Sequence, residues 1–113
     1  MKRGEVWLIN LDPTIGAEIK KTRPAVIVNA DQLGKLPLKV IVPITDWKSH
    51  YAVAPWMVKI TPSSNNGLSK NSSADCFQVR SVSEERFVKR IGCLTQGQME
   101  EISHGLSAVL QLG

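Results

Sequence analysis

The chain has 113 residues, of which 42% are hydrophobic and 21% are charged, the composition of an ordinary globular protein. This length suits one compact core, so we expect a single domain over residues 1–113. Fourteen Lys and Arg against ten Asp and Glu give a formal net charge of +4, a mild excess that favours a polyanionic partner without requiring one. The composition excludes an intrinsically disordered chain, and two cysteines are too few for a disulfide scaffold.

The N-terminal residues Met1–Glu5 run directly into a strand-like segment and contain no apolar signal core. The longest apolar runs fall well short of the roughly 20 residues that span a bilayer. We therefore expect a cytoplasmic protein with no membrane partner. Cys76 and Cys93 lack any CxxC or Cys/His metal spacing and adjoin apolar residues, which predicts buried thiols and no metal site.

Short apolar segments separated by turn residues predict a mainly β chain. The expected strands cover residues 5–11, 24–29, 38–44, 55–60, 73–80 and 87–91. Pro43 lies inside the third of these strands, which favours an edge position or a bulge at that point. Ser83 is expected to cap a short helical turn that continues to Arg86.

One sustained helix is expected, at the C-terminus. Thr95 and Gln98 match a capping box, and an apolar stripe follows at helical spacing. The stripe consists of Met99, Ile102, Leu106, Val109 and Leu110. Five or six short strands closed by one helix indicate a small, strongly curved sheet or a partly closed barrel.

Two polar residues at the ends of apolar runs are the main candidates for chemistry. Arg23 stands before Pro24, and its guanidinium is suited to clamp a phosphate through two donors. Thr45 ends the next apolar run and carries a hydroxyl donor, so we expect the two side chains to face one surface. On spacing alone, an ordinary surface arginine and a strand-end threonine explain the pattern better. Glu18, in the loop before Arg23, is either a solvated carboxylate or a group that orients Arg23 or accepts a proton.

These residues belong to a longer pattern of short motifs. It consists of Lys2–Leu8 (KRGEVWL), Leu11–Thr14 (LDPT), Gly16, Glu18, Thr22–Val26 (TRPAV), Val42–Thr45 (VPIT), Gln78–Arg80 (QVR) and Arg86. This pattern resembles the MazF/PemK family of toxin endoribonucleases, and the resemblance covers nearly the whole chain in the order of the family.

The resemblance implies a fold and a set of partners. The fold is mainly β with a C-terminal α-helix, an SH3-like small barrel of the MazF/PemK/CcdB type. The protein would be the toxin of a type II toxin–antitoxin system, an mRNA interferase that cuts single-stranded RNA at short sequences without a metal or other cofactor. Its partners would be the RNA substrate, a second copy in a homodimer, and a cognate MazE-like antitoxin that occupies the RNA groove. It would meet operator DNA only through the antitoxin complex.

The resemblance also implies site residues. Arg23 and Thr45 match the catalytic pair of the family, in which the ribose 2′-hydroxyl attacks the adjacent phosphate and leaves 2′,3′-cyclic phosphate and 5′-hydroxyl ends. Ala17 stands where some members carry a histidine, and Asp75 is displaced from the acid–base position that others use. Glu18 is therefore the supporting carboxylate that we expect, and Asp75 is not expected to act as the base.

Residues expected to contact RNA lie on the surrounding loops, each with a plainer alternative. The two lysines are either phosphate contacts or a solvated basic run, and the loop aromatics either stack bases or fold back on their own core. Gln78 either reads a base edge or satisfies the loop backbone. The expected RNA-binding residues are Thr14, Lys20, Lys21, Trp47, His50, Tyr51, Gln78 and Arg80.

Two other functions remain open from the sequence. The first is a CcdB-like toxin of the same fold that poisons a topoisomerase without cleaving RNA. Such a protein would not need Arg23 and would act through its C-terminal helix. The second is a non-catalytic SH3-like binding module.

Overall fold

The computed structural model describes every residue from Met1 to Gly113. Seven strands and a C-terminal helix form the framework, which confirms a mainly β fold closed by one helix. The elements are β1 (Glu5–Asn10), β2 (Thr22–Ile27), β3 (Leu38–Asp46), β4 (Met57–Ile60), β5 (Ser72–Asp75), β6 (Arg80–Ser83), β7 (Phe87–Cys93) and α1 (Gln96–Leu110).

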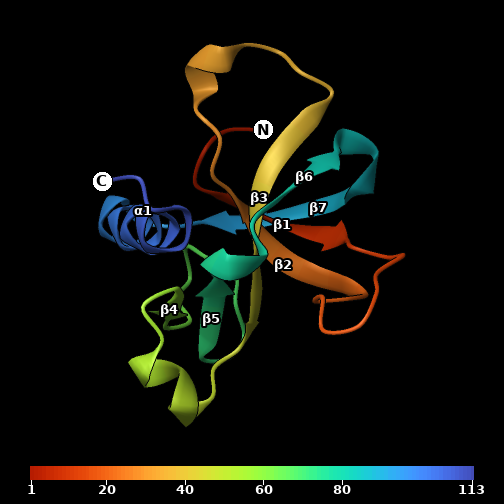
Figure 1. Cartoon of the computed structure of the whole chain (residues 1–113). Helices are drawn as coiled ribbons and strands as arrows, with labels where there is room; N and C mark the ends of the chain where they lie inside the picture. The colour runs from red at the N-terminus through yellow and green to blue at the C-terminus, as the bar shows by residue number, and fades with distance from the viewer.

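All strand pairs are antiparallel, and the sheet order is β4-β5-β3-β2-β1-β7, with β6 also paired to β3. One edge of β3 therefore carries two partners, β6 along Leu38–Ile41 and β5 along Ile44–Asp46. Figure 1 shows α1 along one side of the curved sheet and the β1–β2 loop projecting from the opposite side. The short turn after Ser83 is present, and the Ser83 hydroxyl accepts a hydrogen bond from the Glu85 N–H.

The single strand expected over residues 73–80 is wrong, because the chain turns in its middle. β5 ends at Asp75, a 3₁₀ turn covers Cys76–Gln78, and β6 begins at Arg80. The Asp75 carboxylate accepts a hydrogen bond from the Phe77 N–H at 3.1 Å, which starts the turn locally. The turn carries the chain from one half of β3 to the other.

The edge position expected for Pro43 is also wrong, since β3 is a central strand. Val28 N–H donates to the Val40 carbonyl, so the hydrogen-bonded pairs between β2 and β3 involve even-numbered residues. The Pro43 nitrogen therefore points to the other edge of β3. There it falls between the end of β6 pairing at Ile41 and the start of β5 pairing at Ile44, so the missing N–H removes no ladder bond.

The buried side chains form two clusters on opposite faces of the sheet. One contains Val26, Val42 and Ile102 among its members, and α1 covers it. The other contains Ile9, Ala25 and Ile41 and lies on the β6 side. The predicted capping box of α1 is present, with reciprocal bonds between Thr95 and Gln98. No helix in the structure has the length and apolar character that crossing a membrane requires.

Two sequence expectations about burial are wrong at the ends of elements. Leu110, placed in the apolar stripe, is 52% exposed because it closes the last turn of α1. Cys93 is exposed, since Leu94 takes the buried position and neighbouring strand residues face opposite ways. Cys76 is buried as expected, and burial followed by the nearby Asp75 charge raises the pKa of its thiol to about 12.

The helix approaches the Cys76 turn closely at one glycine, which generates a first prediction. A Cβ added at Gly105 would lie 2.7 Å from the Cys76 Sγ. We expect Gly105→Ala to lower the free energy of unfolding by about 1–3 kcal/mol through overpacking, measured by urea denaturation. The loss should shrink when Cys76→Ala removes the sulfur.

A matched control lies in the same helix. A Cβ at Gly97 would meet only the Thr95 Oγ1, at 3.9 Å. Gly97→Ala should leave the protein as stable as before or stabilise it, because alanine is the better helix former by about 1 kcal/mol. Equal effects of the two substitutions would contradict close packing at Gly105.

Candidate functional site

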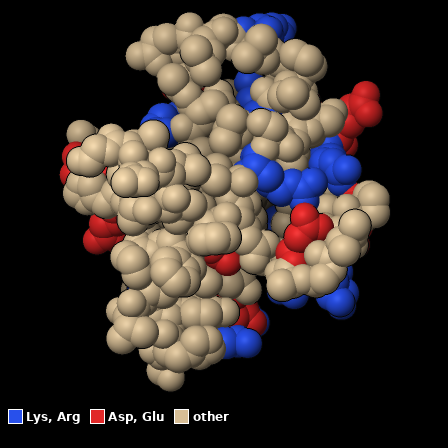
Figure 2. Space-filling view, viewed as in Figure 1, with Lys and Arg blue, Asp and Glu red and all other residues tan.

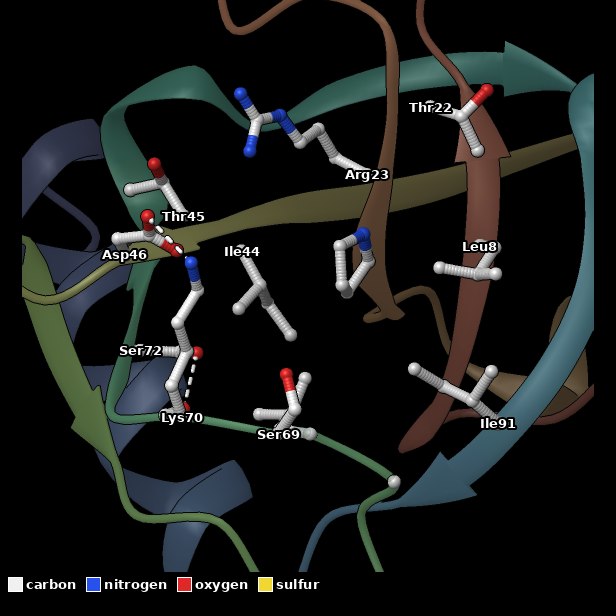
Figure 3. Close-up of a pocket in the computed structure, with 13 residues that line it drawn as sticks. Leu8, Thr22, Arg23, Ile44, Thr45, Asp46, Ser69, Lys70, Ser72 and Ile91 are labelled. Atoms are coloured by element: carbon white, nitrogen blue, oxygen red, sulfur yellow. Dashed lines mark hydrogen bonds and ion pairs between the residues drawn. The ribbon is translucent and has the colours of Figure 1, made fainter.

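Arg23 and Thr45 lie opposite each other at one end of the β2–β3 pair. The register sets Ala25 against Pro43, and two further residues along each strand bring Arg23 against Thr45. Residues two apart on a strand share a face, so both side chains project from the same side of the sheet. Both line a hollow of about 300 Å³. Figure 3 shows the Arg23 guanidinium and the Thr45 hydroxyl on the same side of the strands.

The hollow opens here because the β2–β3 ladder ends. The next hydrogen-bonded pair would join residue 24 to Ile44, but Pro24 has no N–H to donate. This pair therefore lacks one of its two bonds, and the ladder ends at Ala25 opposite Pro43. Leu8, Ile44 and Ile91 point into the space as an apolar floor (Figure 3). Because neighbouring strand residues face opposite ways, the Arg23 and Thr45 side chains stand at the rim of this hollow and turn away from its apolar lining.

Neither candidate catalytic side chain is used by the fold. Arg23 is half-buried and forms no ion pair, and its one hydrogen bond within the protein is a long one from Nε to the Lys20 carbonyl, at 3.4 Å. The Thr45 hydroxyl has no hydrogen-bond partner in the protein. The two terminal nitrogens of Arg23 and the Thr45 hydroxyl are thus free to donate to a ligand that approaches this face of the sheet.

Sequence reasoning missed two charged residues at the same rim. Asp46 follows Thr45 directly, and its carboxylate pairs with the Lys70 ammonium at 3.1 Å (Figure 3). Lys70 comes from the long loop before β5, so only the fold brings it to this place. The pair cancels its own charge and leaves Arg23 as the uncompensated cation of the rim.

Glu18 lies in a different hollow. This second hollow, of about 500 Å³, has the β1–β2 loop on one side and Phe77–Arg80 on the other, with Pro43 in its floor. Since Pro43 shares a face with Arg23 and Thr45, these two side chains form a ridge on the same face of the sheet as the second hollow. The Glu18 carboxylate accepts the Ile15 N–H at 2.6 Å and makes no ion pair with Arg23. An orienting role of Glu18 on Arg23 is therefore absent from this structure.

Two arginines hold the start of the β1–β2 loop. Arg80 donates to the Leu11 carbonyl at 3.4 Å, and Arg86 donates to the carbonyls of Asn10, at 3.2 Å, and Asp12. Lys and Arg side chains gather where β6 meets this loop (Figure 2). Arg86 was known from the sequence only as part of a family pattern. Its bonds to the Asn10 and Asp12 carbonyls could not be predicted from the sequence, because these residues lie more than 70 positions away along the chain.

Gln78 also bonds to the loop. Its Oε1 accepts the Ile19 N–H at 2.6 Å, which is the loop-backbone alternative of the two that the sequence left open. The neighbouring Asp75 is buried, and this burial raises the pKa of its carboxyl, while hydrogen bonds from Phe77 and Gln78 oppose the rise. Asp75 lines neither hollow, and its absence from the acid–base chemistry stays a prediction.

The remaining expected RNA contacts are spread over the surface. Trp47 and His50 both pack edge-on against Tyr51, with ring centroids 5.9 Å and 4.6 Å away, and all three lie outside both hollows. The loop aromatics therefore fold on one another. Thr14 bonds its own loop through Asp12, at 3.3 Å. Lys20 and Lys21 are exposed on the loop, free to meet a ligand. No cluster of three or more His, Cys, Asp and Glu is arranged to hold a metal ion.

Comparisons with known proteins indicate a single protein family. Residues 2–110 match the family described as PemK-like, MazF-like toxin of type II toxin–antitoxin system. The chain is 31% identical to endoribonuclease MazF9 of Mycobacterium tuberculosis, over 99% of this chain and 98% of that protein. It is 32% identical to endoribonuclease PemK of Escherichia coli, over 97% and 82% of the two chains.

Solved structures agree in fold. MazF of Deinococcus radiodurans superimposes with a TM-score of 0.81 at 20% identity, covering 98% of this chain and 96% of that one. A MazE–MazF complex of the same organism matches with a TM-score of 0.74 at 19% identity, covering 100% and 97%. At such identities the likeness shows the shared fold.

The free donor groups of Arg23 and Thr45 generate a second prediction. We expect Arg23→Ala and Thr45→Val to change the free energy of unfolding by less than about 0.5 kcal/mol, because the fold does not use either polar group. As a control, Arg86→Ala should cost about 1 kcal/mol or more, since it leaves loop carbonyls without a charged donor. Urea denaturation measures all three. If Arg23→Ala costs as much as Arg86→Ala, Arg23 is a structural residue.

Proposed function

The chain belongs to the PemK-like, MazF-like toxins of type II toxin–antitoxin systems, and from this premise we propose that it is a sequence-specific endoribonuclease. The substrate is single-stranded RNA, above all mRNA, and no metal takes part. The observation that carries the proposal is the position of Arg23 opposite Thr45 at the open end of the β2–β3 ladder, where the two terminal nitrogens of Arg23 and the Thr45 hydroxyl have no partner in the protein. Two relatives named as endoribonucleases, at 31% and 32% identity, support it.

The chemistry needs donors rather than a built-in nucleophile. The 2′-oxygen of the substrate attacks the neighbouring phosphorus, the bond from phosphorus to the 5′-oxygen breaks, and the products carry 2′,3′-cyclic phosphate and 5′-hydroxyl ends. The proton of the 2′-hydroxyl passes to a base, and the leaving 5′-oxygen takes up a proton from water. Arg23 stabilises the charge of the phosphorane with its two terminal nitrogens, and Thr45 donates to a non-bridging oxygen.

The ridge suits an RNA strand that crosses it. With the scissile phosphate on Arg23 and Thr45, the nucleotide on one side falls toward the second hollow, which lies on the same face. Glu18 lines the second hollow, so a ribose on that side presents its 2′-hydroxyl toward the carboxylate. We assign Glu18 the role of proton acceptor in this arrangement. Lys20 and Lys21 contact neighbouring phosphates from the exposed face of the loop.

The partners follow from the family. We propose that a cognate MazE-like antitoxin covers the ridge and inhibits the toxin, that the toxin is a homodimer, and that operator DNA is met only through the antitoxin complex. A solved MazE–MazF complex of the same fold supports the first of these. The single-domain organisation over residues 1–113 and the cytoplasmic setting belong to the same proposal.

A topoisomerase-poisoning toxin of the same fold is the alternative within this architecture. It would bind a protein and cleave nothing, so it would have no use for free terminal nitrogens of an arginine beside a free threonine hydroxyl. The free Arg23 therefore favours the ribonuclease, and the same argument weighs against a non-catalytic binding module.

The third prediction tests cleavage directly. Purified protein incubated with a mixed pool of single-stranded RNA, in the presence of EDTA, should produce cuts at one short sequence. Sequencing of the 5′ ends and end-group analysis should find 5′-hydroxyl and 2′,3′-cyclic phosphate. Arg23→Ala should slow cutting by about 10²–10³-fold or more, the effect of losing a preorganised donor to transition-state charge.

The control is the folded state of the variant, checked by circular dichroism, together with Lys48→Ala as an exposed cation outside both hollows. Cuts that persist unchanged in Arg23→Ala come from a contaminating nuclease. Absence of any discrete cut by the wild-type protein would sink the proposed activity.

The fourth prediction concerns Glu18. Glu18→Gln keeps an oxygen that can accept the Ile15 N–H and removes the basic carboxylate. We therefore expect the loop to keep its shape and the cleavage rate to fall by about 10²-fold, the lower end of what general base catalysis contributes. Glu100→Gln, on the exposed face of α1, serves as the charge-matched control. A near wild-type rate for Glu18→Gln would remove Glu18 from the mechanism.

A further inference from the structure

The β1–β2 loop carries Glu18 outside any strand, and one side chain bonds to the backbone on both sides of this residue. The Oε1 of Gln78 accepts the Ile19 N–H at 2.6 Å, and its Nε2 lies 3.4 Å from the Ala17 carbonyl. Ala17 and Ile19 are the two neighbours of Glu18 in the chain. Gln78 therefore brackets Glu18, and the direction of the Glu18 carboxylate depends on this bracket.

The orientation of the Gln78 amide is itself determined by a buried partner. Asp75 is 5% exposed, and its Oδ2 accepts a hydrogen bond from the Gln78 Nε2 at 3.2 Å. An ionised carboxylate accepts hydrogen bonds and donates none, so the nitrogen end of the amide must face Asp75. The oxygen end is then directed at Ile19. Without an acceptor at position 75, the two ends of the amide could exchange places.

Asp75 is held in turn by the backbone of the 3₁₀ turn. Its Oδ1 accepts the Phe77 N–H at 3.1 Å, so the carboxylate is tied to the turn through one oxygen and to Gln78 through the other. The turn packs against α1, where Gly105 allows close approach to Cys76. The residue that orients Gln78 is therefore buried, and the turn that holds it packs against α1.

We propose that Asp75 and Gln78 form a positioning pair for the β1–β2 loop, which sets Glu18 and the wall of the second hollow for catalysis. The inference rests on the ribonuclease activity proposed above and assigns a task to two residues that the mechanism does not use. Gln78 acts through the loop backbone and does not read a base. Asp75 acts through Gln78.

The test exchanges the two functional groups. In Gln78→Glu, the side chain at position 78 loses its donor and places a second carboxylate beside Asp75, so the bracket should open. In the double variant, which combines Asp75→Asn with Gln78→Glu, the new amide at position 75 supplies the donor that the glutamine nitrogen provided. The new carboxylate at position 78 accepts the Ile19 N–H. The double variant restores the bonds to Ile19, to Phe77 and between the pair at unchanged net charge, and leaves only the long bond to the Ala17 carbonyl unmade.

Two readouts are measured on each variant. The first is hydrogen exchange of the Ile19 amide in the RNA-free protein, expected to be slow in the wild type, fast in Gln78→Glu and slow again in the double variant. The second is kcat/KM for cleavage of an RNA oligonucleotide. It should fall by about 10- to 100-fold in Gln78→Glu, the effect of a slightly misplaced catalytic group, and return to near the wild-type value in the double variant.

Gln78→Leu provides a second loss variant of similar size without the added charge, and circular dichroism confirms that each variant is folded. The Gln78→Leu variant should match Gln78→Glu in both Ile19 exchange and kcat/KM. Fast Ile19 exchange and slow cleavage that the double variant does not rescue would overturn the pairing. Unchanged Ile19 exchange with an altered cleavage sequence would make Gln78 a base reader and overturn the positioning role.

The outcomes separate this inference from the proposed activity. If the exchange pattern of Ile19 follows the bracket while no protein, wild type included, cuts RNA, then the ribonuclease proposal fails and the loop bracket alone stands. If RNA is cut at the same sites by all variants at the same rate, the ribonuclease proposal stands and the positioning pair is overturned.

Discussion

The long strand β3 divides one of its edges between two partners, and the site depends on this division. β6 pairs with its first half and β5 with its second, so the chain between them must cross the gap beside Val42 and Pro43. The crossing is the Cys76–Gln78 turn, which thereby arrives next to the β1–β2 loop. Pro43 fills the gap at no cost in ladder bonds, because its nitrogen points there. The hollow beside Glu18 is the space between this crossing and the loop.

The arginines of the chain fall into two groups with different physical tasks. Arg80 and Arg86 donate to loop carbonyls and belong to the scaffold. Arg23 makes one long bond to Lys20 and has no carboxylate partner. A folded chain gains little from a cation held in this way, since neither an ion pair nor a good hydrogen bond accompanies its partial burial. Its charge is available for a negatively charged ligand, which is the property that the proposed chemistry requires.

Local chemical signals were readable from the sequence, and long-range ones were not. The capping box at Thr95, the turn capped by Ser83 and the convergence of Arg23 with Thr45 follow from residues close together or from strand ends. Nothing local marks the change of partner inside residues 73–80. An aspartate within an apolar segment does not by itself show that its carboxylate will accept the Phe77 N–H and end the strand. The position of Lys70 beside Asp46 and the position of Glu18 in the second hollow depend on the assembled sheet, so neither could be predicted from neighbouring residues in the sequence.

The fastened β1–β2 loop has an entropic consequence. Ordering a residue of flexible backbone costs roughly 1–2 kcal/mol of free energy, and in this protein Gln78, Arg80 and Arg86 fasten the loop before any ligand arrives. That cost is met during folding and is absent from the binding step. A ligand that binds beside this loop therefore keeps more of its contact energy as affinity. Against a flexible loop, part of that energy would be lost in ordering the loop on binding.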